Sequence, residues 1–485
     1  MDDITRFLPE LIVLATAGLV VLVDLLPIDR RVLPWLTLLG LAISCGWTVG
    51  LIVAGGQGRA FGDMLRVDAF HIFFLFLFQA VAAVIVLSAM DFIGQMPDRQ
   101  GEFYALVLAV ATGAMLLSGA NDLIMIFISL ELTSISQYAL AGFMRDTRSS
   151  EAGMKYLLLG AVSTATLLYG MALLFGLSGT TSLPGIAAAL QSASDNLRPA
   201  YLLAATLLAA GFGFKMAVFP FQMWVPDVYE GAPTPVSAYL SVASKAAAFA
   251  IVLRIFFAAL GNKTIAPEWA NLFAILAAIS MTLGNVVAIQ QHNIKRLFGY
   301  SSVAQAGNFM VGIAAVSAAN GRFTIGASGV LFFIAAYAFT NLGAFLAIIA
   351  ISDAVGSEEI GDYAGLGRRA PWLAAILAFC LISLTGLPPT AGFFAKVYIF
   401  NAAIQAKFVW LVVIAVLNTL VSAVYYLGVV RTMYLGEPKG EGRLRAGIPI
   451  SFGMAVSALG VLVFGVVPGP LLTAAQKAAD VFAVH

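Results

Sequence analysis

Charged residues, cysteines and histidines are all scarce in this sequence. Only 11% of the 485 residues are charged, whereas 61% are hydrophobic. Soluble domains carry about 25% charged residues, so the composition excludes an ordinary soluble fold. The net charge of +1 is too small to attract a polyanion, and we expect no nucleic-acid partner. The two cysteines, Cys45 and Cys380, cannot supply the thiolates of an iron–sulfur cluster or build a disulfide framework.

Long apolar runs are what the sequence has in abundance. They recur along the whole chain at about 20 residues each, which is enough to cross a bilayer as a helix. The connections between them are short and rich in Gly, Pro, Asn and Asp. The sequence therefore predicts an all-α polytopic membrane protein with about 14 transmembrane helices. The predicted spans are 8–27, 33–54, 69–90, 103–119, 121–143, 154–177, 200–222, 234–259, 269–290, 299–318, 324–352, 371–399, 404–431 and 448–474.

The distribution of Lys and Arg predicts the orientation. The loops that follow the odd-numbered spans hold more basic residues than the loops on the other side. Because basic loops stay in the cytoplasm, we expect the N-terminus to lie outside.

Four of the 26 basic residues lie inside predicted spans: Lys215, Lys245, Arg254 and Lys396. A charge at mid-bilayer costs roughly 2.5–3.5 kcal/mol on insertion scales, so each needs a reason. Arg254 lies near the end of its span, and we interpret it as reaching the interface or joining two helices. We expect a functional role for the three lysines, with static helix contacts as the alternative.

Prolines predict helix breaks inside two spans. A proline cannot donate to the carbonyl four residues back, and its ring clashes there. Pro220 therefore interrupts one span, and Pro388 and Pro389 free the carbonyls of Leu384 and Thr385 in another. Exposed backbone at membrane depth is tolerated only inside protein or beside a water-filled cavity.

Each predicted break lies close to a stranded lysine, Lys215 in one span and Lys396 in the other. Transporters use broken helices to build ion sites. The repeated arrangement predicts two related halves.

A third lysine follows a segment rich in turn residues. Lys245 comes ten residues after Pro235, which is roughly 15 Å along a helix and near mid-membrane. The residues expected to form a turn between two spans are Pro226, Asp227, Gly231, Pro233 and Pro235.

Glu131 is the clearest acidic partner, because it lies at the centre of a span. A carboxylate there must be paired or neutral. Paired with Lys215, it would form a couple in which each group biases the protonation of the other, as a proton relay requires. A static ion pair is the alternative. Gln305, Asn418 and Tyr425 could continue the relay or simply join helices by hydrogen bonds.

Three long segments resemble the antiporter-like membrane subunits of NADH:quinone oxidoreductase, respiratory complex I. They are "FPFQMWVPDVYEGAPTPVSAYLSVASKAAAF" (219–249), "NIKRLFGYSSVAQAG" (293–307) and "LTGLPPTAGFFAKVYIF" (384–400). The wording "DVYEGAPTPV…SVASKAA" is most similar to the subunit N branch, compared with subunits L and M and the multisubunit sodium/proton antiporters.

The resemblance implies two inverted five-helix repeats with broken helices. It divides the chain into N-terminal helices (1–102), a first repeat (103–259), a second repeat (260–431) and a C-terminal helix (432–485). It also implies a relay formed by Glu131, its partner Lys215, the connecting Lys245 and the second broken-helix lysine, Lys396. Many family members have a histidine where this chain has Gln305, and glutamine cannot hold an extra proton at neutral pH.

The function implied by the resemblance is proton translocation within a translocating NADH:quinone oxidoreductase. We expect no redox centre in this chain, with NADH, FMN, iron–sulfur clusters and quinone in partner subunits. The expected partners are other membrane subunits, the lipid bilayer, protons and internal water, in a bacterial inner membrane. A sodium/proton antiporter subunit and a purely structural chain are the alternatives. A quinone-binding enzyme is a weaker idea, because the sequence has only three histidines.

Overall fold

The computed structural model describes residues 2–27, 29–94, 97–315, 324–440 and 442–483. Within these ranges, 12 helices are long and apolar enough to cross a membrane. The other two predicted spans are also helical. One is α13 (Ile294–Ala314), which Gln305 and Asn308 make less apolar, and the other is divided into α16 and α17 by a break. The structure confirms the all-α polytopic fold.

The N-terminal part contains three membrane helices and a small hairpin on the side of the membrane where the chain starts. The elements are α1 (Asp3–Asp24), α2 (Val32–Val53), β1 (Gly58–Ala60), β2 (Leu65–Val67), α3 (Ala69–Gly94) and a 3-10 turn (Pro97–Arg99). The two strands pair antiparallel, with Arg59 opposite Arg66. The hairpin was not predicted, because its strands are only three residues long.

Five spans follow, and the fourth of them is broken. They are α4 (Gln100–Gly119), α5 (Leu123–Ala141), α6 (Thr147–Ser178), α8 (Arg198–Met216) with α9 (Trp224–Gly231), and a final span from Thr234 to Ala259. This last span consists of α10 (Thr234–Tyr239), a π-helical turn (Leu240–Ser244), α11 (Lys245–Leu253) and a second π-helical turn (Arg254–Ala259). The unpredicted α7 (Leu183–Ser192) and a 3-10 turn (Asp195–Leu197) lie between α6 and α8.

A second group of five spans repeats this order, again with the fourth broken. They are α12 (Ala266–Ala288), α13, α14 (Thr324–Val355), α16 (Pro371–Thr385) with α17 (Ala391–Gln405), and α18 (Val409–Leu435). A 3-10 turn (Ile360–Tyr363) and α15 (Leu366–Arg369) precede α16, and α19 (Ile448–Val466), α20 (Gly469–Ala479) and a last 3-10 turn (Asp480–Phe482) end the described chain. Because each group has an odd number of spans, the second starts on the opposite side of the membrane. This is the inverted arrangement that the resemblance implies.

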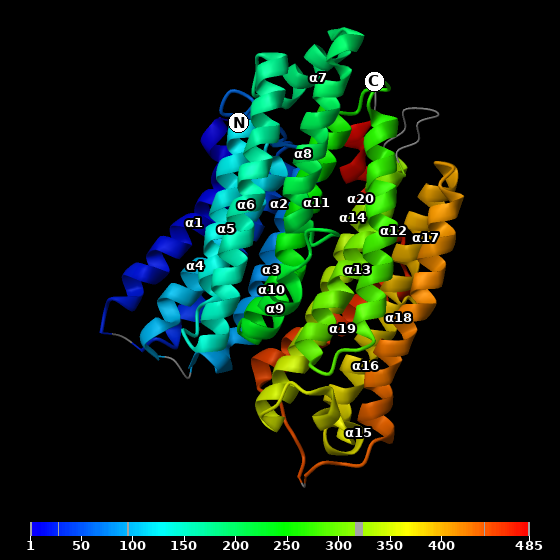
Figure 1. The fold of residues 1–485 in the computed structure, drawn as a ribbon. Helices are drawn as coiled ribbons and strands as arrows, with labels where there is room; N and C mark the ends of the chain where they lie inside the picture. Colours follow the sequence, from blue (N-terminus) through cyan, green and yellow to red (C-terminus); the bar gives the residue numbers. More distant parts are fainter. Residues whose placement is uncertain (1, 28, 95–96, 316–323, 441, 484–485) are drawn as a thin grey trace.

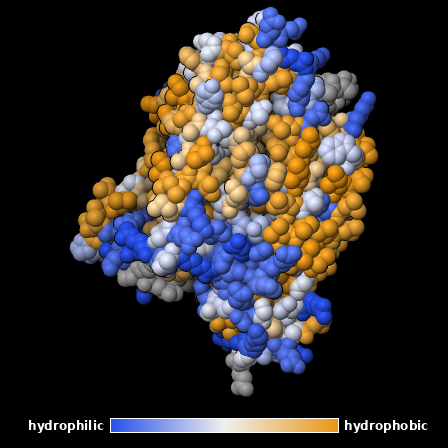
Figure 2. All heavy atoms as spheres, viewed as in Figure 1, coloured by the Kyte–Doolittle hydropathy of each residue, from blue (hydrophilic) through white to orange (hydrophobic). Residues whose placement is uncertain are grey.

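The centre of the bundle is formed by one span from each group. The span Thr234–Ala259 and α14 are each 94% buried over their most apolar window, whereas α1, α2 and α18 are 33% buried. Figure 1 shows α7 and the start of α1 at the upper end of the bundle, and α9 and α15 at the lower end. In Figure 2, apolar side chains cover the flanks and hydrophilic side chains gather toward the lower end. Lys245, on the first of these spans, is thus screened from lipid.

Several predicted boundaries are wrong. The turn expected from Pro226 to Pro235 contains α9, because Pro226 lies in the first turn of this helix, where proline is tolerated. The span 200–222 ends at Met216, and the span 448–474 ends at Val466 before Pro468. The predicted end of the span 299–318 lies outside the described residues.

Candidate functional site

Both predicted helix breaks are present. The segments 217–223 and 386–390 are non-helical, and they contain Pro220 and the pair Pro388–Pro389. The two preceding helices end in the same way, with Ala217 (φ 62°) and Gly386 (φ 89°) in left-handed conformation. Each break therefore presents the carbonyl end of a helix, with its partial negative charge, inside the membrane region.

Lys396 binds the carbonyl end of α16 at the second break. Its Nζ donates to the Thr385 carbonyl (2.8 Å) and to Thr419 Oγ1 (3.3 Å), and Gln305 Nε2 donates to the Leu384 carbonyl (3.1 Å). These are the two carbonyls that the prolines were predicted to free. Two predicted site residues from different helices therefore bind neighbouring carbonyls of one helix end.

Lys245 lies at the first residue of α11, directly after a π-helical turn, a feature common at functional sites. Its side chain is buried, and Nζ donates to the carbonyl and the hydroxyl of Ser302 on α13. The Ser302 hydroxyl is also within 3.1 Å of the Tyr229 hydroxyl and accepts from Tyr337 at 3.5 Å. Lys245 therefore connects the first group of spans to the second through Ser302.

Lys215 has a different environment from the other two lysines. Its Nζ lies 5.0 Å from the centre of the Tyr138 ring, 5.2 Å from Tyr156 and 5.6 Å from Phe214. Within the described part of the chain, this buried nitrogen has no hydrogen-bond partner. Aromatic faces attract a cation without accepting its protons in conventional hydrogen bonds. At the break in the first broken helix, the Lys215 ammonium group is therefore stabilised only weakly, by aromatic rings.

Glu131 is half-buried on α5 and accepts a hydrogen bond from Thr164 Oγ1 on α6 (3.0 Å). No direct ion pair joins it to Lys215 among the described residues. The predicted couple is therefore not in contact in this conformation. Glu131 and Tyr138 are seven residues apart on α5, so they lie on the same face of that helix.

Asn418 and Tyr425 meet at a residue that the sequence analysis missed. Asn285 of α12 donates to Asn418 Oδ1 (3.1 Å) and accepts from the Tyr425 hydroxyl (2.9 Å), and Asn418 also donates to Thr282 (3.1 Å). These bonds join α12 to α18, as expected for polar residues between membrane helices. An amide in an apolar run was the available signal for Asn285.

Ser301 and Tyr426 were also missed. The Ser301 hydroxyl is hydrogen-bonded to the Tyr426 hydroxyl. Ser301 precedes Ser302 in the sequence, and Tyr426 follows Tyr425 on α18. The only signal was the serine pair in "GYSSVAQAG". The contact links the surroundings of Lys245 to those of Asn285.

Arg254 joins helices, as one of the two interpretations of its charge predicted. Its guanidinium is bidentate to Asp68 (2.8 and 3.0 Å), Nε donates to the Ser118 carbonyl (2.5 Å), and the group stacks over Phe70 at 4.8 Å. Every nitrogen of the guanidinium thus has a partner, and a relay role is not needed to explain this residue.

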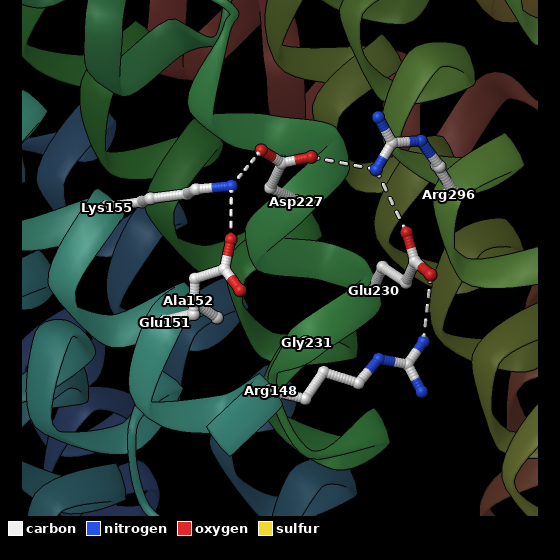
Figure 3. Close-up of a pocket in the computed structure, with 8 residues that line it drawn as sticks. All are labelled: Arg148, Glu151, Ala152, Lys155, Asp227, Glu230, Gly231 and Arg296. Carbon is white, nitrogen blue, oxygen red and sulfur yellow. Dashed lines mark hydrogen bonds and ion pairs between the residues drawn. The ribbon is translucent and has the colours of Figure 1, made fainter.

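A second site lies at the lower end of the bundle, where charged side chains surround a pocket of about 190 Å³. Figure 3 shows side chains of alternating sign from α6, α9 and α13: Glu151, Lys155, Asp227, Arg296, Glu230 and Arg148. Asp227 accepts from Lys155 (2.7 Å) and Arg296 (2.8 Å). Burial acts to raise the pKa of the Asp227 carboxyl, but the hydrogen bonds from Lys155 and Arg296 outweigh it and hold this pKa below its ordinary value. This cluster couples the two groups of spans.

The broken helices and buried lysines define an antiporter-like membrane protein, and comparison with known proteins agrees. Residues 120–422 match the family described as NADH:quinone oxidoreductase/Mrp antiporter, TM. NADH-quinone oxidoreductase subunit N of Dehalococcoides mccartyi is 43% identical over 98% of this chain and 99% of its own length. Subunit N of Moorella thermoacetica is 42% identical over 94% and 93%. The chain therefore belongs to the NADH:quinone oxidoreductase/Mrp antiporter family, on the branch of the subunit N proteins.

Solved structures give the same result for the fold. A chain of respiratory complex I from Thermus thermophilus with bound aureothin is 32% identical, with a TM-score of 0.78, covering 96% of this chain and 98% of that chain. A chain of the Mrp complex from Dietzia superposes with a TM-score of 0.84 at 20% identity, covering 99% and 97%, a likeness of fold alone.

Proposed function

We propose that this chain is a proton-translocating membrane subunit of an NADH:quinone oxidoreductase, in which Glu131, Lys215, Lys245 and Lys396 carry the relay. NADH, FMN, the iron–sulfur clusters and quinone belong to partner subunits, and this chain has no redox step of its own. It acts beside other membrane subunits in a bacterial inner membrane, with its N-terminus outside. The relay extends over two repeats, residues 103–259 and residues 260–431.

The observation that carries the proposal is the line of buried polar contacts between Lys245 and Lys396. It begins at Lys245–Ser302, and Gln305, one helical turn further along α13, binds the helix end that Lys396 also binds. A cavity of about 10 Å³ lies among Gln305, Tyr337 and Lys396, about the space that one water molecule needs. Water in this cavity would bridge the amide of Gln305 to Lys396, so a proton could pass although Gln305 itself does not titrate.

The same argument extends to Lys215. Its Nζ, the Tyr138 hydroxyl and the Ser244 hydroxyl are buried side-chain groups for which the described residues provide no hydrogen-bond partner. Buried polar groups are normally satisfied, by water if not by protein. Since Ser244 precedes Lys245, bound water here would connect Lys215 to Lys245.

Glu131 supplies the switch in this proposal. While its carboxylate is held by Thr164, the charge on Lys215 has only aromatic faces near it. Movement of the carboxylate toward Lys215 would favour the protonated amine, and its return would favour proton release toward Lys245. A conformational or electrostatic signal from electron transfer in other subunits would drive that movement.

The testing experiment replaces Lys215 by Met in the assembled complex. NADH-driven quinone reduction and proton pumping into vesicles should both fall about tenfold or more, because a thioether cannot carry a proton. Lys263→Met is the matched control, since Lys263 is exposed on a loop, and it should leave both rates unchanged.

Full pumping by an assembled Lys215→Met complex would overturn the relay and leave a structural role for this lysine. Sodium/proton exchange by the isolated chain without NADH would favour the antiporter alternative. The two results separate the assigned residues from the assigned reaction.

A further inference from the structure

A second buried titratable pair lies in the N-terminal helices, outside the two groups of five spans. Glu10 of α1 and His71 of α3 are both 0% exposed, and Glu10 Oε1 lies 2.9 Å from His71 Nε2. His71 Nδ1 lies 2.9 Å from the Ser118 hydroxyl of α4. None of these residues belongs to the lysine relay described above.

The hydrogen-bond partners fix where protons must be. The Ser118 hydroxyl donates its single proton to the Met115 carbonyl (2.7 Å), so it can only accept from His71. His71 Nδ1 must therefore carry a proton. The short contact between Nε2 and Glu10 Oε1 then requires one more proton, held either as imidazolium–carboxylate or as imidazole–carboxylic acid. The pair thus shares a proton inside the protein.

The other oxygen of Glu10 is open. Oε2 is buried and has no hydrogen-bond partner among the described residues. The same is true of Oε1 of Gln79, which lies two turns after His71 on α3. Gln79 donates to Ser44 (2.8 Å), which donates to the carbonyl of Pro9, the neighbour of Glu10. A buried acceptor without a donor, such as Glu10 Oε2, is a place for bound water, which can deliver a proton.

The two buried charges next to the pair, those of Asp68 and Arg254, balance each other. Asp68 accepts from the His71 backbone N–H (2.9 Å) and forms the bidentate pair with Arg254. Arg66 lies 3.8 Å from Asp68 and is exposed, as is Lys477 of the adjacent α20. The Asp68–Arg254 pair has all its main acceptor and donor atoms bonded and is a fixed ion pair. Glu10, with one free oxygen, is not.

The pair lies close to the side of the membrane where the chain starts. Glu10 follows Arg6 by four residues, about 6 Å along a helix, and Arg6 bonds to the exposed hairpin through the Arg59 carbonyl (2.8 Å). Ser118 is the second-last residue of α4, and Arg254 begins the last turn of its span. A proton at Glu10 is therefore one helical turn below this surface.

We propose that Glu10 and His71 form a proton-loading site that exchanges protons with the N-terminal side of the membrane during turnover. A water at Oε2 takes up a proton from the N-terminal side of the membrane as it gives one to the carboxylate, which leaves a carboxylic acid beside the imidazolium. The same exchange runs in reverse when the site unloads. No other bond changes. The site rests on the proposed function only in that translocation drives its loading.

The experiment compares Glu10→Gln with Glu10→Asp in the assembled complex. Glutamine keeps an acceptor for His71 but cannot take a proton, whereas aspartate still can. Glu10→Gln should lower proton pumping about tenfold, and Glu10→Asp should retain most of it. Asp68→Asn is the control for a fixed ion pair, and only assembly of the complex is measured for this variant. Turnover-induced infrared difference spectra should contain a carboxylic-acid band that Glu10→Gln removes and Glu10→Asp shifts.

Normal pumping and an unchanged infrared band in Glu10→Gln would overturn the proposal. If Glu10→Gln fails to assemble, the double variant Glu10→His with His71→Glu provides the test. It keeps both groups and should retain pumping and the infrared band. Loss of both in an assembled double variant would also overturn the proposal. If Lys215→Met pumps normally and still has the carboxylic-acid band, the lysine relay fails while the Glu10–His71 site stands.

Discussion

Lys215, Lys245 and Lys396 differ in what faces the ammonium group, although all three side chains are buried. A helix carbonyl end and a hydroxyl accept from Lys396, and a serine accepts twice from Lys245. Hydrogen bonds to a charged group are the strong ones. The charged form of Lys215 has only ring faces beside it. Of the three, Lys215 is therefore the residue whose protonation depends most on the position of a distant carboxylate.

Lys396→Met should abolish most of the pumping while the complex assembles. The substitution removes the proton carrier and leaves the Thr385 carbonyl without its 2.8 Å donor, so we expect a loss of about tenfold or more in NADH-driven proton uptake into vesicles. Thr419→Val removes only the 3.3 Å contact and should retain most of the activity. Equal rates in Lys396→Met and wild type would show that the second break is not on the proton path.

Arg254→Met should destabilise the chain rather than uncouple it. The change leaves the Asp68 carboxylate buried without its partner, which costs about 3–5 kcal/mol. Thermal unfolding of the purified complex measures the loss. The double variant Arg254→Met with Asp68→Leu has no stranded charge and should recover most of it. Failure of the double variant to recover would contradict this account.

At the scale of elements, the break between α16 and α17 depends on small residues as well as on proline. A Cβ on Gly386 would lie 2.8 Å from Lys396 Cδ, and its φ of 89° disfavours any side chain. A Cβ on Gly392 would lie 1.9 Å from the Ser383 carbonyl oxygen. The helix end and the lysine that binds it therefore leave no room for a methyl group.

Gly386→Ala should displace Lys396 and cost about 1 kcal/mol or more in stability, because alanine is strained in the left-handed region. Gly428→Ala on α18 is the matched control, since no atom lies within 4 Å of its added Cβ, and it should be neutral or stabilising. Thermal unfolding and pumping of both variants make the comparison. A Gly386→Ala variant that pumps like the control would contradict the tight geometry.

The sequence predicted the spans and breaks well because hydropathy and proline chemistry act locally. It could place Lys396 beside freed carbonyls, since both lie within 12 residues. It could not place Glu131, because the direction of a side chain on α5 depends on packing against α6. The contact of Tyr425 with Asn285 spans 140 residues and leaves no local signal. The short α7 and α9 were missed because turn residues conceal helices of two to three turns.

At the scale of the whole molecule, the charged cluster at the lower end holds α9 of the first group against α13 of the second. Asp227 of α9 bonds both to Lys155 of α6 and to Arg296 of α13. Its side chain is part-exposed, so the contribution of the cluster lies in fixing the two groups against each other more than in stability.

Asp227→Asn should loosen this contact in a pH-dependent way. Because the folded state lowers the pKa of Asp227, its stabilisation is present above the ordinary value of 3.8 and is lost as pH falls through the lowered value. The unfolding rate of the variant should therefore exceed that of wild type at pH 7 and converge with it in acid. Glu151→Gln, at a more exposed position, should have a smaller effect. A difference that persists below both pKa values would contradict the assignment.

The burial of the central span has a consequence for biogenesis. The segment Thr234–Ala259 leaves the translocon with two cations, Lys245 and Arg254, and in the folded protein 94% of its most apolar window is buried. Asp68 and the Ser118 carbonyl, which bind Arg254, are synthesised earlier, but Ser302, which binds Lys245, is synthesised later. The Arg254 end of this span can therefore dock during synthesis. Its middle, with Lys245, must wait for α13, and until then the lysine stays hydrated or neutral.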